Sequence, residues 1–453
     1  MSARLLATIL VCGLLGATTI AQSALKPIPF TDTRLSNGLR VIISEDHYAP
    51  VFAIAVSYGV GSKDERAGRT GFAHLFEHMM FKGSENVGSG EHFFLVFNYG
   101  GSMNGTTNTD RTVYYEVLPK NQLDLGLFLE ADRMKSLAIT KENLDNQRNA
   151  VQEERRLRLD NQPYGKSQER FNEMAYDNFA YKHSVIGSME DLNAATVNDV
   201  ADFFKTYYAP NNAVLSLVGD LDTKATLAKV EKYFASIPRQ QAPKPVDLAE
   251  QELKAERRES MTDPLARVPQ INMGYRIPPA SHPDWPALSV LGQILGGGES
   301  SRLYQAVVKE KELCTGTGAG SGARMGPALF NVTCSVRAGK DIKEAEAALN
   351  DVLSAAATAP VTEQELQRVR ASLRRNDVAM RQSVLSRATT LADYAVLYDD
   401  PNRINTLSTR LGAVRLADVQ RVARTYLRPE NRVVMHTLPG AAAPPAPPAT
   451  QSR

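Results

Sequence analysis

The chain has 453 residues, of which 43% are hydrophobic and 23% charged, so it has ordinary globular composition and enough length for two or three domains. Lysine and arginine (52) nearly balance aspartate and glutamate (50), and the net charge of +2 is too small to imply nucleic-acid binding. The composition excludes intrinsic disorder, collagen-like repeats and small disulfide scaffolds.

The first 23 residues have the pattern of a secretory signal peptide. An early Arg4 is followed by an apolar run and then by the small-residue exit Ala21-Gln22-Ser23. The apolar run spans about 16 residues and contains glycine and threonine, so it is shorter than the ~20 residues that cross a bilayer. We therefore expect cleavage before Ala24 and export, with the periplasm as the favoured destination and no membrane anchor in the mature protein.

Three cysteines occur, and Cys12 lies in the predicted signal peptide. The mature chain would keep Cys314 and Cys334 only. In an oxidising compartment these two could pair across neighbouring strands, and the sequence leaves that pairing open.

Two segments of the chain recur at nearly one spacing. Residues 197–220 match residues 416–440 at an interval of 219, and residues 139–155 match residues 361–377 at an interval of 222. The first match includes a shared Thr-Tyr pair followed by a shared proline and asparagine. Such a period is far longer than the 20 to 50 residues of solenoid repeats, so it indicates two tandem homologous domains.

The composition along the chain places the boundaries. We expect a signal peptide at 1–23, a first domain at 24–236, a linker at 237–260, a second domain at 261–440 and a tail at 441–453. The linker is polar and begins with several prolines. The tail is rich in alanine and proline and cannot bury a core, so we expect it to be disordered.

Strands and helices are mixed in each half. Apolar runs at 39–44 and 51–60 predict strands, and apolar residues three and four apart at 123–136 predict a helix. The strand-like segment 112–119 follows the turn-like NGTTNTD, which indicates antiparallel pairing. We therefore predict an α+β fold of two α/β-sandwich domains rather than a doubly wound parallel sheet.

The segment GFAHLFEHMMFKG carries the strongest chemical signal. On a helix, His74 and His78 project from one face about one turn apart, and Glu77 borders that face. This H-x-x-E-H order is the inverse of the zincin motif, in which two histidines bind zinc and the glutamate acts on water. The alternative is an ordinary helix that carries two of the seven histidines. Apolar flanks favour a metal site, because three buried polar groups cost several kcal/mol unless paired or metal-bound.

A catalytic zinc needs a third protein ligand and one open position. The best source is the segment NAVQEER, where Glu153 and Glu154 follow Ala150-Val151. The charged run around them is by itself most simply a solvated helix face, and spacing does not choose between the two carboxylates.

The chain resembles the pitrilysin/insulinase family of zinc metallopeptidases, in particular its short members related to mitochondrial processing peptidase subunits. The likeness covers residues 31–440 and is carried by these motifs: SNGLRVIISED, GFAHLFEHMMFKGS, MNGTTNTDRTVYYE, RNAVQEER, YYAPNNAVLSLVGDLD and GGGESSRLYQAV. In that family the third ligand ends an N-A-V-x-x-E stretch about 75 residues beyond the second histidine. Here 75 residues lie between His78 and Glu154. The resemblance thus implies Glu154 as the third ligand, with Glu153 as the fallback.

The resemblance also implies the fold of the LuxS and mitochondrial-processing-peptidase type, with two domains facing each other around a peptide chamber. Zinc is expected in the first domain only, one ion per chain, because the second half has no H-x-x-E-H and places Asn376 opposite Glu154 in the repeat alignment. The implied activity is zinc-dependent endopeptidase cleavage of extended peptides, with Glu77 moving the protons. Substrate would lie beside the strand that contains Asn104 and Gly105, which match the family's Asn-Ala pair.

Two positions depart from the family pattern. Many members carry a glutamate seven residues before the third ligand, whereas this chain has Gln147, so we expect an altered rate rather than lost activity. Complete members also carry an arginine and a tyrosine, seven apart, in the non-metal half, and here Val308 and Thr315 occupy those places. Lys309 or Arg302 could substitute, and GGGESSRL at 296–303 could contact substrate or only join helices.

Short members of this family work as pairs of chains. We therefore expect a heteromer in which this chain bears the zinc and a homologous subunit supplies the Arg/Tyr pair. The alternatives are a self-sufficient homodimeric peptidase and a non-catalytic scaffold or assembly protein.

Overall fold

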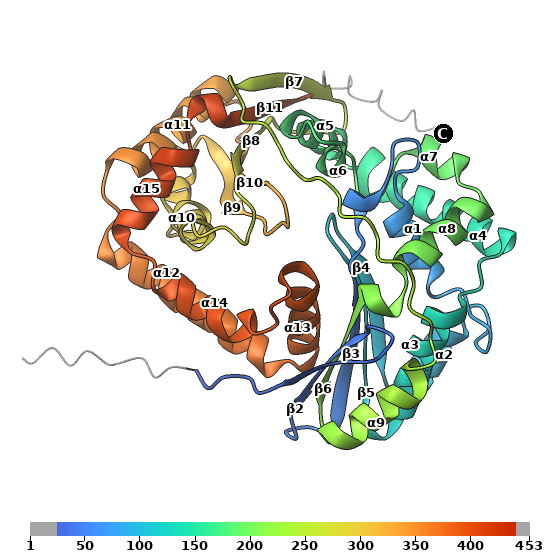
Figure 1. Ribbon diagram of the computed structural model, residues 1–453. Coiled ribbons are helices and arrows are strands. Elements are labelled where there is room, and N and C mark those ends of the chain that lie inside the picture. The colour runs from blue at the N-terminus through green and yellow to red at the C-terminus, as the bar shows by residue number, and fades with distance from the viewer. Residues whose placement is uncertain (1–24, 441–453) are drawn as a thin grey trace, which may run out of the picture.

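Two open β-sheets, each packed with helices, organise residues 25–440, the part of the chain that the computed structural model describes (Figure 1). One sheet belongs to each half of the chain, so the predicted α+β fold with two tandem domains is confirmed. The predicted signal peptide at 1–23 and the tail at 441–453 lie outside the described residues. Within 25–440, no helix has both the length and the apolar character needed to cross a membrane.

The first sheet has six strands in the order β1-β2-β6-β3-β5-β4. Its strands are β1 (Thr31–Arg34), β2 (Arg40–Glu45), β3 (Val51–Tyr58), β4 (Ser102–Thr107), β5 (Thr112–Pro119) and β6 (Ala213–Gly219). β2 and β6 run parallel, and the other neighbours, including the predicted pair β4 and β5, are antiparallel. The helices of this half are α1 (Phe72–Met79), α2 (Glu91–Asn98), α3 (Leu123–Ser136), α4 (Lys141–Arg155), α5 (Gly165–Ala175), α6 (Phe179–Lys182), α7 (Met189–Ala194), α8 (Val197–Tyr207) and α9 (Thr223–Phe234).

The second sheet has five strands in the order β7-β11-β8-β10-β9. Its strands are β7 (Arg257–Asp263), β8 (Gln270–Ile277), β9 (Cys314–Ser321), β10 (Ala328–Val336) and β11 (Arg432–Pro439). Its helices are α10 (Trp285–Gly296), α11 (Ile342–Thr358), α12 (Glu363–Gln382), α13 (Val384–Tyr398), α14 (Arg403–Gly412) and α15 (Leu416–Tyr426). Between the halves, residues 235–256 form neither helix nor strand.

Both halves repeat one topology. Without β1, the first sheet reads β2-β6-β3-β5-β4 and corresponds strand by strand to the second, with the parallel pair at the same place. Asn212 and Asn431 even make the same hydrogen bond. Their side-chain amides donate to the carbonyl oxygens of Tyr207 at 2.8 Å and Tyr426 at 2.9 Å. The duplication inferred from the sequence is therefore a duplication of structure.

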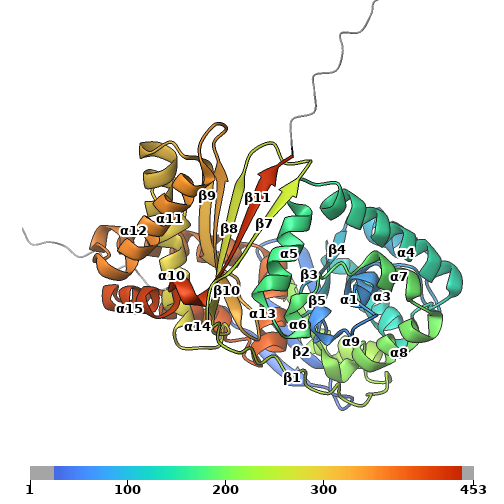
Figure 2. The ribbon, with the colours of Figure 1, turned by 90° about the horizontal axis from the view of Figure 1, so that it is seen from above.

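Each sheet is covered on one face by a helix from the other half. Helix α13 of the second half packs against β3 and β6, and helix α5 of the first half packs against β7 and β11 (Figures 1 and 2). Along β3, Phe52 and Ile54 point into the helices of their own half, whereas the alternate Ala53 and Ala55 face α13. The small alanine side chains let the helix approach the sheet closely, so the two halves share buried apolar surface.

Cys314 and Cys334 form a disulfide. Cys314 on β9 and Cys334 on β10 lie on neighbouring antiparallel strands with their Cα atoms 6.1 Å apart. The bond ties the outermost strand of the second sheet to its neighbour.

Candidate metal centre

Helix α1 begins at a sharply constrained turn. Gly71, which precedes it, has φ +85°, and a Cβ there would lie 2.6 Å from the carbonyl oxygen of Ile186. The buried carboxylate of Glu65 accepts hydrogen bonds from the backbone N–H groups of Gly71 and Ala73, both at 2.8 Å. These contacts satisfy N–H groups that helix formation leaves free and fix the direction in which α1 presents its histidines.

The structure brings the three predicted ligands together. His74 Nε2 lies 3.6 Å and His78 Nε2 lies 3.1 Å from Glu154 Oε2, and the three donor atoms fall within 4.8 Å of one another. The meeting results from the packing of α4 against α1. Glu153, the fallback, is 58% exposed and pairs with Arg156 instead. The geometry therefore favours Glu154.

The electrostatics of this cluster suit a metal ion. Burial, helped by the neighbouring His78, lowers the pKa of His74 to about 3, so its imidazole is neutral at physiological pH and offers a lone pair. His74 Nδ1 is also buried and has no hydrogen-bond partner among residues 25–440. Two imidazole nitrogens and one carboxylate oxygen form a donor set that fits a catalytic zinc with one open position.

Glu77 lies beside these groups on α1 and is partly buried. Burial raises the pKa of its carboxyl, while a hydrogen bond with Thr107 on β4 acts in the opposite direction. A Cβ on Gly105 would lie only 3.1 Å from Glu77 Cγ, so the glycine leaves space for this carboxylate against the strand. A carboxyl with a raised pKa next to a metal site can exchange protons with a reacting water.

The predicted substrate contacts, Asn104 and Gly105, lie on β4 at the edge of the first sheet. β4 pairs only with β5 among the described strands, so no strand covers its other edge and an extended peptide could add there. The Asn104 side chain accepts a hydrogen bond from its neighbour's N–H at 2.8 Å. Gln147 lies two turns before Glu154 on α4, is buried, and donates to Asn146.

A cavity of about 350 Å³ opens beside the cluster. Its walls come from both halves of the chain and include these residues: His74, Thr107, Thr109, Glu154, Arg158, Leu159, Asn172, Tyr181, His183, Ser184, Val185, Ile186 and Arg324. Arg158, His183 and Arg324 could not be predicted from the sequence. No local pattern marks them, because they become neighbours only where the turn after α4, the residue after α6 and the β9–β10 loop line one cavity.

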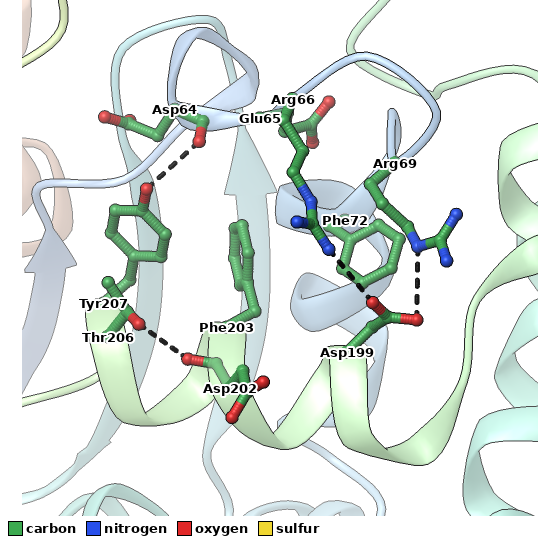
Figure 3. Close-up of a pocket in the computed structure, with 10 residues that line it drawn as sticks. All are labelled: Asp64, Glu65, Arg66, Arg69, Phe72, Asp199, Asp202, Phe203, Thr206 and Tyr207. Carbon is green, nitrogen blue, oxygen red and sulfur yellow. Dashed lines mark hydrogen bonds and ion pairs between the residues drawn. The ribbon is translucent and has the colours of Figure 1, made fainter.

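A second cavity, of about 330 Å³, lies between the loop that precedes α1 and helix α8 (Figure 3). Two of its arginines pair with one aspartate: Asp199 lies 3.2 Å from Arg66 Nη2 and 3.1 Å from Arg69 Nε. Tyr207 donates to the carbonyl oxygen of Asp64 at 3.1 Å. These contacts hold the entry to α1 in place.

The second half offers no arginine or tyrosine at the two positions where the family resemblance places them. Val308 packs beside the apolar core of that half, and the hydroxyl of Thr315 donates to the carbonyl oxygen of Ser335. Of the two suggested substitutes, Arg302 is held by Glu365 through hydrogen bonds of 2.6 and 2.9 Å, and Lys309 is exposed.

A convergent His-His-Glu set with a further carboxylate beside it, between two α/β domains, is the arrangement of a metal-dependent hydrolase. Comparison with known families agrees with this class. Residues 40–188 match the model of Insulinase (Peptidase family M16), and residues 194–373 match that of the Peptidase M16 inactive domain. The chain therefore belongs to peptidase family M16, the insulinase family.

Individual relatives are similar over nearly the whole length. The chain is 29% identical over 421 residues to the zinc protease PqqE of Helicobacter pylori, covering 91% of this chain and 93% of that protein. The crystal structure of a protease from Helicobacter pylori has 27% identity and a TM-score of 0.87, and the match covers 91% of this chain and 100% of that one. The first half of the periplasmic protease PqqL from Escherichia coli shares the fold, with 21% identity, a TM-score of 0.75 and coverage of 92% of this chain and 94% of that half. The chain covers 48% of complete PqqL.

Proposed function

We propose that this protein is an exported zinc metalloendopeptidase that cuts extended peptides. One observation carries the proposal: the donor atoms of His74, His78 and Glu154 lie within 4.8 Å of one another, as the ligands of one metal ion must. Family membership and relatives named zinc proteases support the same reading. The proposed stoichiometry is one zinc ion per chain, because the second half has no second copy of the H-x-x-E-H segment.

The chain's own groups have distinct roles in this proposal. When bound, a zinc ion would supply Lewis-acid chemistry, lowering the pKa of a water molecule to about 7 and polarising the substrate carbonyl. His74, His78 and Glu154 hold the ion. Glu77 accepts the proton of the attacking water at its carboxylate and passes it to the leaving amine nitrogen, which suits a carboxyl whose pKa burial has raised.

The substrate is proposed to bind as an added strand along β4. Backbone hydrogen bonds would hold it next to Asn104 and Gly105, on the strand that also carries Thr107 beside Glu77. Such binding requires an extended backbone, so unfolded peptides are favoured over folded proteins.

Export is proposed from the signal-peptide pattern of residues 1–23. The disulfide between Cys314 and Cys334 supports an oxidising compartment, because such bonds seldom persist in a reducing cytosol. The related PqqL is described as periplasmic.

We also propose that a homologous partner subunit completes the active peptidase. Support comes from Val308 and Thr315, which offer neither a cation nor a phenol, and from the length of PqqL, of which this chain matches about half. A self-sufficient homodimeric peptidase is the second candidate. It is favoured by Arg324, which the second half already places in the cavity beside His74 and Glu154.

The test is zinc content together with cleavage of an internally quenched peptide of roughly 20 residues by purified 24–453 protein, with and without chelator. One zinc per chain, no cleavage alone and cleavage after mixing with a homologous chain that carries the Arg/Tyr pair would support the heteromer. Chelator-sensitive cleavage by the lone chain, lost in Glu77→Gln, would overturn the partner requirement and support the homodimer. Absence of both zinc and cleavage would overturn the peptidase and leave a scaffold.

A further inference from the structure

The cavity beside the metal centre contains an arginine from the opposite half of the chain. Arg324 lies in the loop between β9 and β10, and its guanidinium carbon stands 5.0 Å from the ring centroid of Tyr176 and 4.9 Å from that of Tyr181. Contact with two aromatic rings fixes the orientation of the planar group. The charge is therefore held in a defined place before any ligand arrives.

The positive charge of Arg324 has no direct counter-ion. No carboxylate among residues 25–440 lies within 4.0 Å of its guanidinium, and Nη1 is buried without a hydrogen-bond partner in that range. Asp110 lies nearby without forming an ion pair with Arg324. It accepts from the Tyr181 hydroxyl at 2.8 Å and from the Met325 N–H at 3.1 Å.

A second arginine adds to the charge of this cavity. Arg158 follows Glu154 by one helical turn, and its Nη1 lies 2.7 Å from Glu154 Oε1, the oxygen that does not face the histidines. Its side chain is 77% exposed, so it can turn toward a ligand in the cavity. His183, on the same wall, pairs with Glu65 at 3.0 Å. Arg158 and Glu154 offset each other, so Arg324 is the arginine of this cavity that has no ion pair within 4.0 Å among residues 25–440.

We propose, on the basis of the proposed peptidase function, that this cavity selects a carboxylate of the substrate and that Arg324 is the residue that determines this specificity. The carboxylate can come from an Asp or Glu side chain next to the cleaved bond or from the C-terminus of a short peptide. A guanidinium held in place loses little freedom when it binds a carboxylate and forms strong charge-assisted hydrogen bonds. A neutral amide of the same shape leaves the charge uncompensated, so the cavity discriminates against it.

The experiment compares matched quenched peptides that differ only by Glu or Gln at one position on either side of the cleaved bond. Each peptide is made with a free and with an amidated C-terminus, which separates the two sources of the carboxylate. We expect kcat/KM to favour the acidic member by about tenfold or more. Arg324→Met should bring the ratio close to one, and Arg324→Lys should retain part of it. Arg337→Met, the same change at an exposed arginine at the end of β10, serves as the control and should keep the wild-type ratio.

A binding measurement makes the inference independent of turnover. The same peptides are labelled, and their binding to Glu77→Gln protein is measured by fluorescence anisotropy. The acidic member should bind more tightly than the neutral one. Adding Arg324→Met to the Glu77→Gln protein should abolish this difference. If the wild type cuts acidic and neutral peptides equally, the inference is wrong and the peptidase stands. If nothing is cut, either by this chain alone or after mixing with the homologous chain, but the acidic peptide binds in an Arg324-dependent manner, the proposed function is wrong and the carboxylate site stands. Equal binding of both peptides overturns the inference.

Discussion

At the scale of single residues, the first domain buries four ionisable side chains next to one another. His92 Nε2 lies 2.6 Å from Glu116 Oε1, and the neighbouring Glu130 is paired with Arg133. All four side chains are nearly inaccessible to solvent. The Arg133 guanidinium also stacks on Tyr114, with 4.7 Å between the guanidinium carbon and the ring centroid. Burial raises the pKa values of Glu116 and Glu130 to about 7 and lowers that of His92 to about 3.

These shifts predict a pH dependence of stability. The folded-state pKa of Glu116 lies above its ordinary value of 4.5. Its favourable contribution to the free energy of unfolding is therefore complete below pH 4.5 and is lost as the pH rises through about 7. Glu116→Gln cannot ionise and escapes this loss. Between pH 5 and pH 8, the unfolding free energy of Glu116→Gln should therefore improve relative to wild type by roughly 1–3 kcal/mol, measured by denaturant titration.

The matched control is Glu153→Gln, which removes an exposed carboxylate on α4. Its difference from wild type should stay constant across the same pH range. A constant difference for Glu116→Gln as well would show that the buried carboxyl does not titrate there.

The Glu153→Gln variant is also the control for a test of the third metal ligand. Glu154→Gln removes the charged oxygen that faces both histidines, so zinc affinity should fall at least about 100-fold, read by competition with a chromophoric chelator. Glu153→Gln should keep wild-type affinity. Loss of zinc in Glu153→Gln but not in Glu154→Gln would reverse the assignment.

At the scale of elements, α1 depends on one carboxylate. Glu65 accepts from two N–H groups at the start of the helix and also lies 3.0 Å from His183 Nε2. His183 Nδ1 faces the carbonyl oxygen of Phe179 at 2.7 Å, so both ring nitrogens face acceptors. Burial lowers the pKa of His183, but the hydrogen bond to Glu65 outweighs it and the pKa is raised overall. One buried acid thus connects the helix of the predicted ligands to α6.

Glu65→Gln should destabilise the protein. A glutamine amide accepts through one oxygen only, so at least one N–H of the helix start or His183 loses its acceptor, at a cost of roughly 1–3 kcal/mol. Thermal unfolding followed by circular dichroism measures the effect. Glu85→Gln, an exposed carboxylate whose pair with Lys135 is 3.6 Å long, should change stability by less than about 0.5 kcal/mol. Equal effects of the two substitutions would contradict the role assigned to Glu65.

At the scale of the whole molecule, the exchanged helices make the two halves interdependent. The face of the first sheet that receives α13 includes Ile42, Ala53 and Ala55, all fully buried against Leu391 and its neighbours. Arg111 of the β4–β5 turn also pairs with Asp393 of α13 at 2.9 Å. A substitution that destabilises one half should therefore destabilise the other half as well.

The single tryptophan, Trp285 on α10, reports on this coupling from the second half. Ile42→Ala removes buried methyl groups from the first sheet at a cost of roughly 2–4 kcal/mol. We expect the melting temperature to fall equally when measured by Trp285 fluorescence and by far-ultraviolet circular dichroism. A fall in the dichroism signal alone, with the fluorescence transition unmoved, would show that the halves unfold independently.

Several elements could be predicted because their signals are local. The helix with His74, Glu77 and His78 shows in its spacing and apolar flanks, and the paired strands β4 and β5 show in the turn between them. The buried group of His92, Glu116, Glu130 and Arg133 gave no such signal, because each of these residues alone resembles an exposed polar residue. The pairing of Cys314 with Cys334 could not be predicted for a related reason: spacing alone does not tell whether two strands are neighbours.

By itself, the sequence determined the duplication, the fold class and the two histidines that share a helix face, because periodic and repeated patterns are properties of the chain alone. Only the tertiary structure decided that Glu154 rather than Glu153 faces those histidines, that the halves exchange helices, and that Arg324 reaches the cavity beside them. These outcomes depend on which surfaces meet when segments more than 70 residues apart in the sequence pack together. Packing at that distance is set by the shape and polarity of whole faces, which no local pattern records.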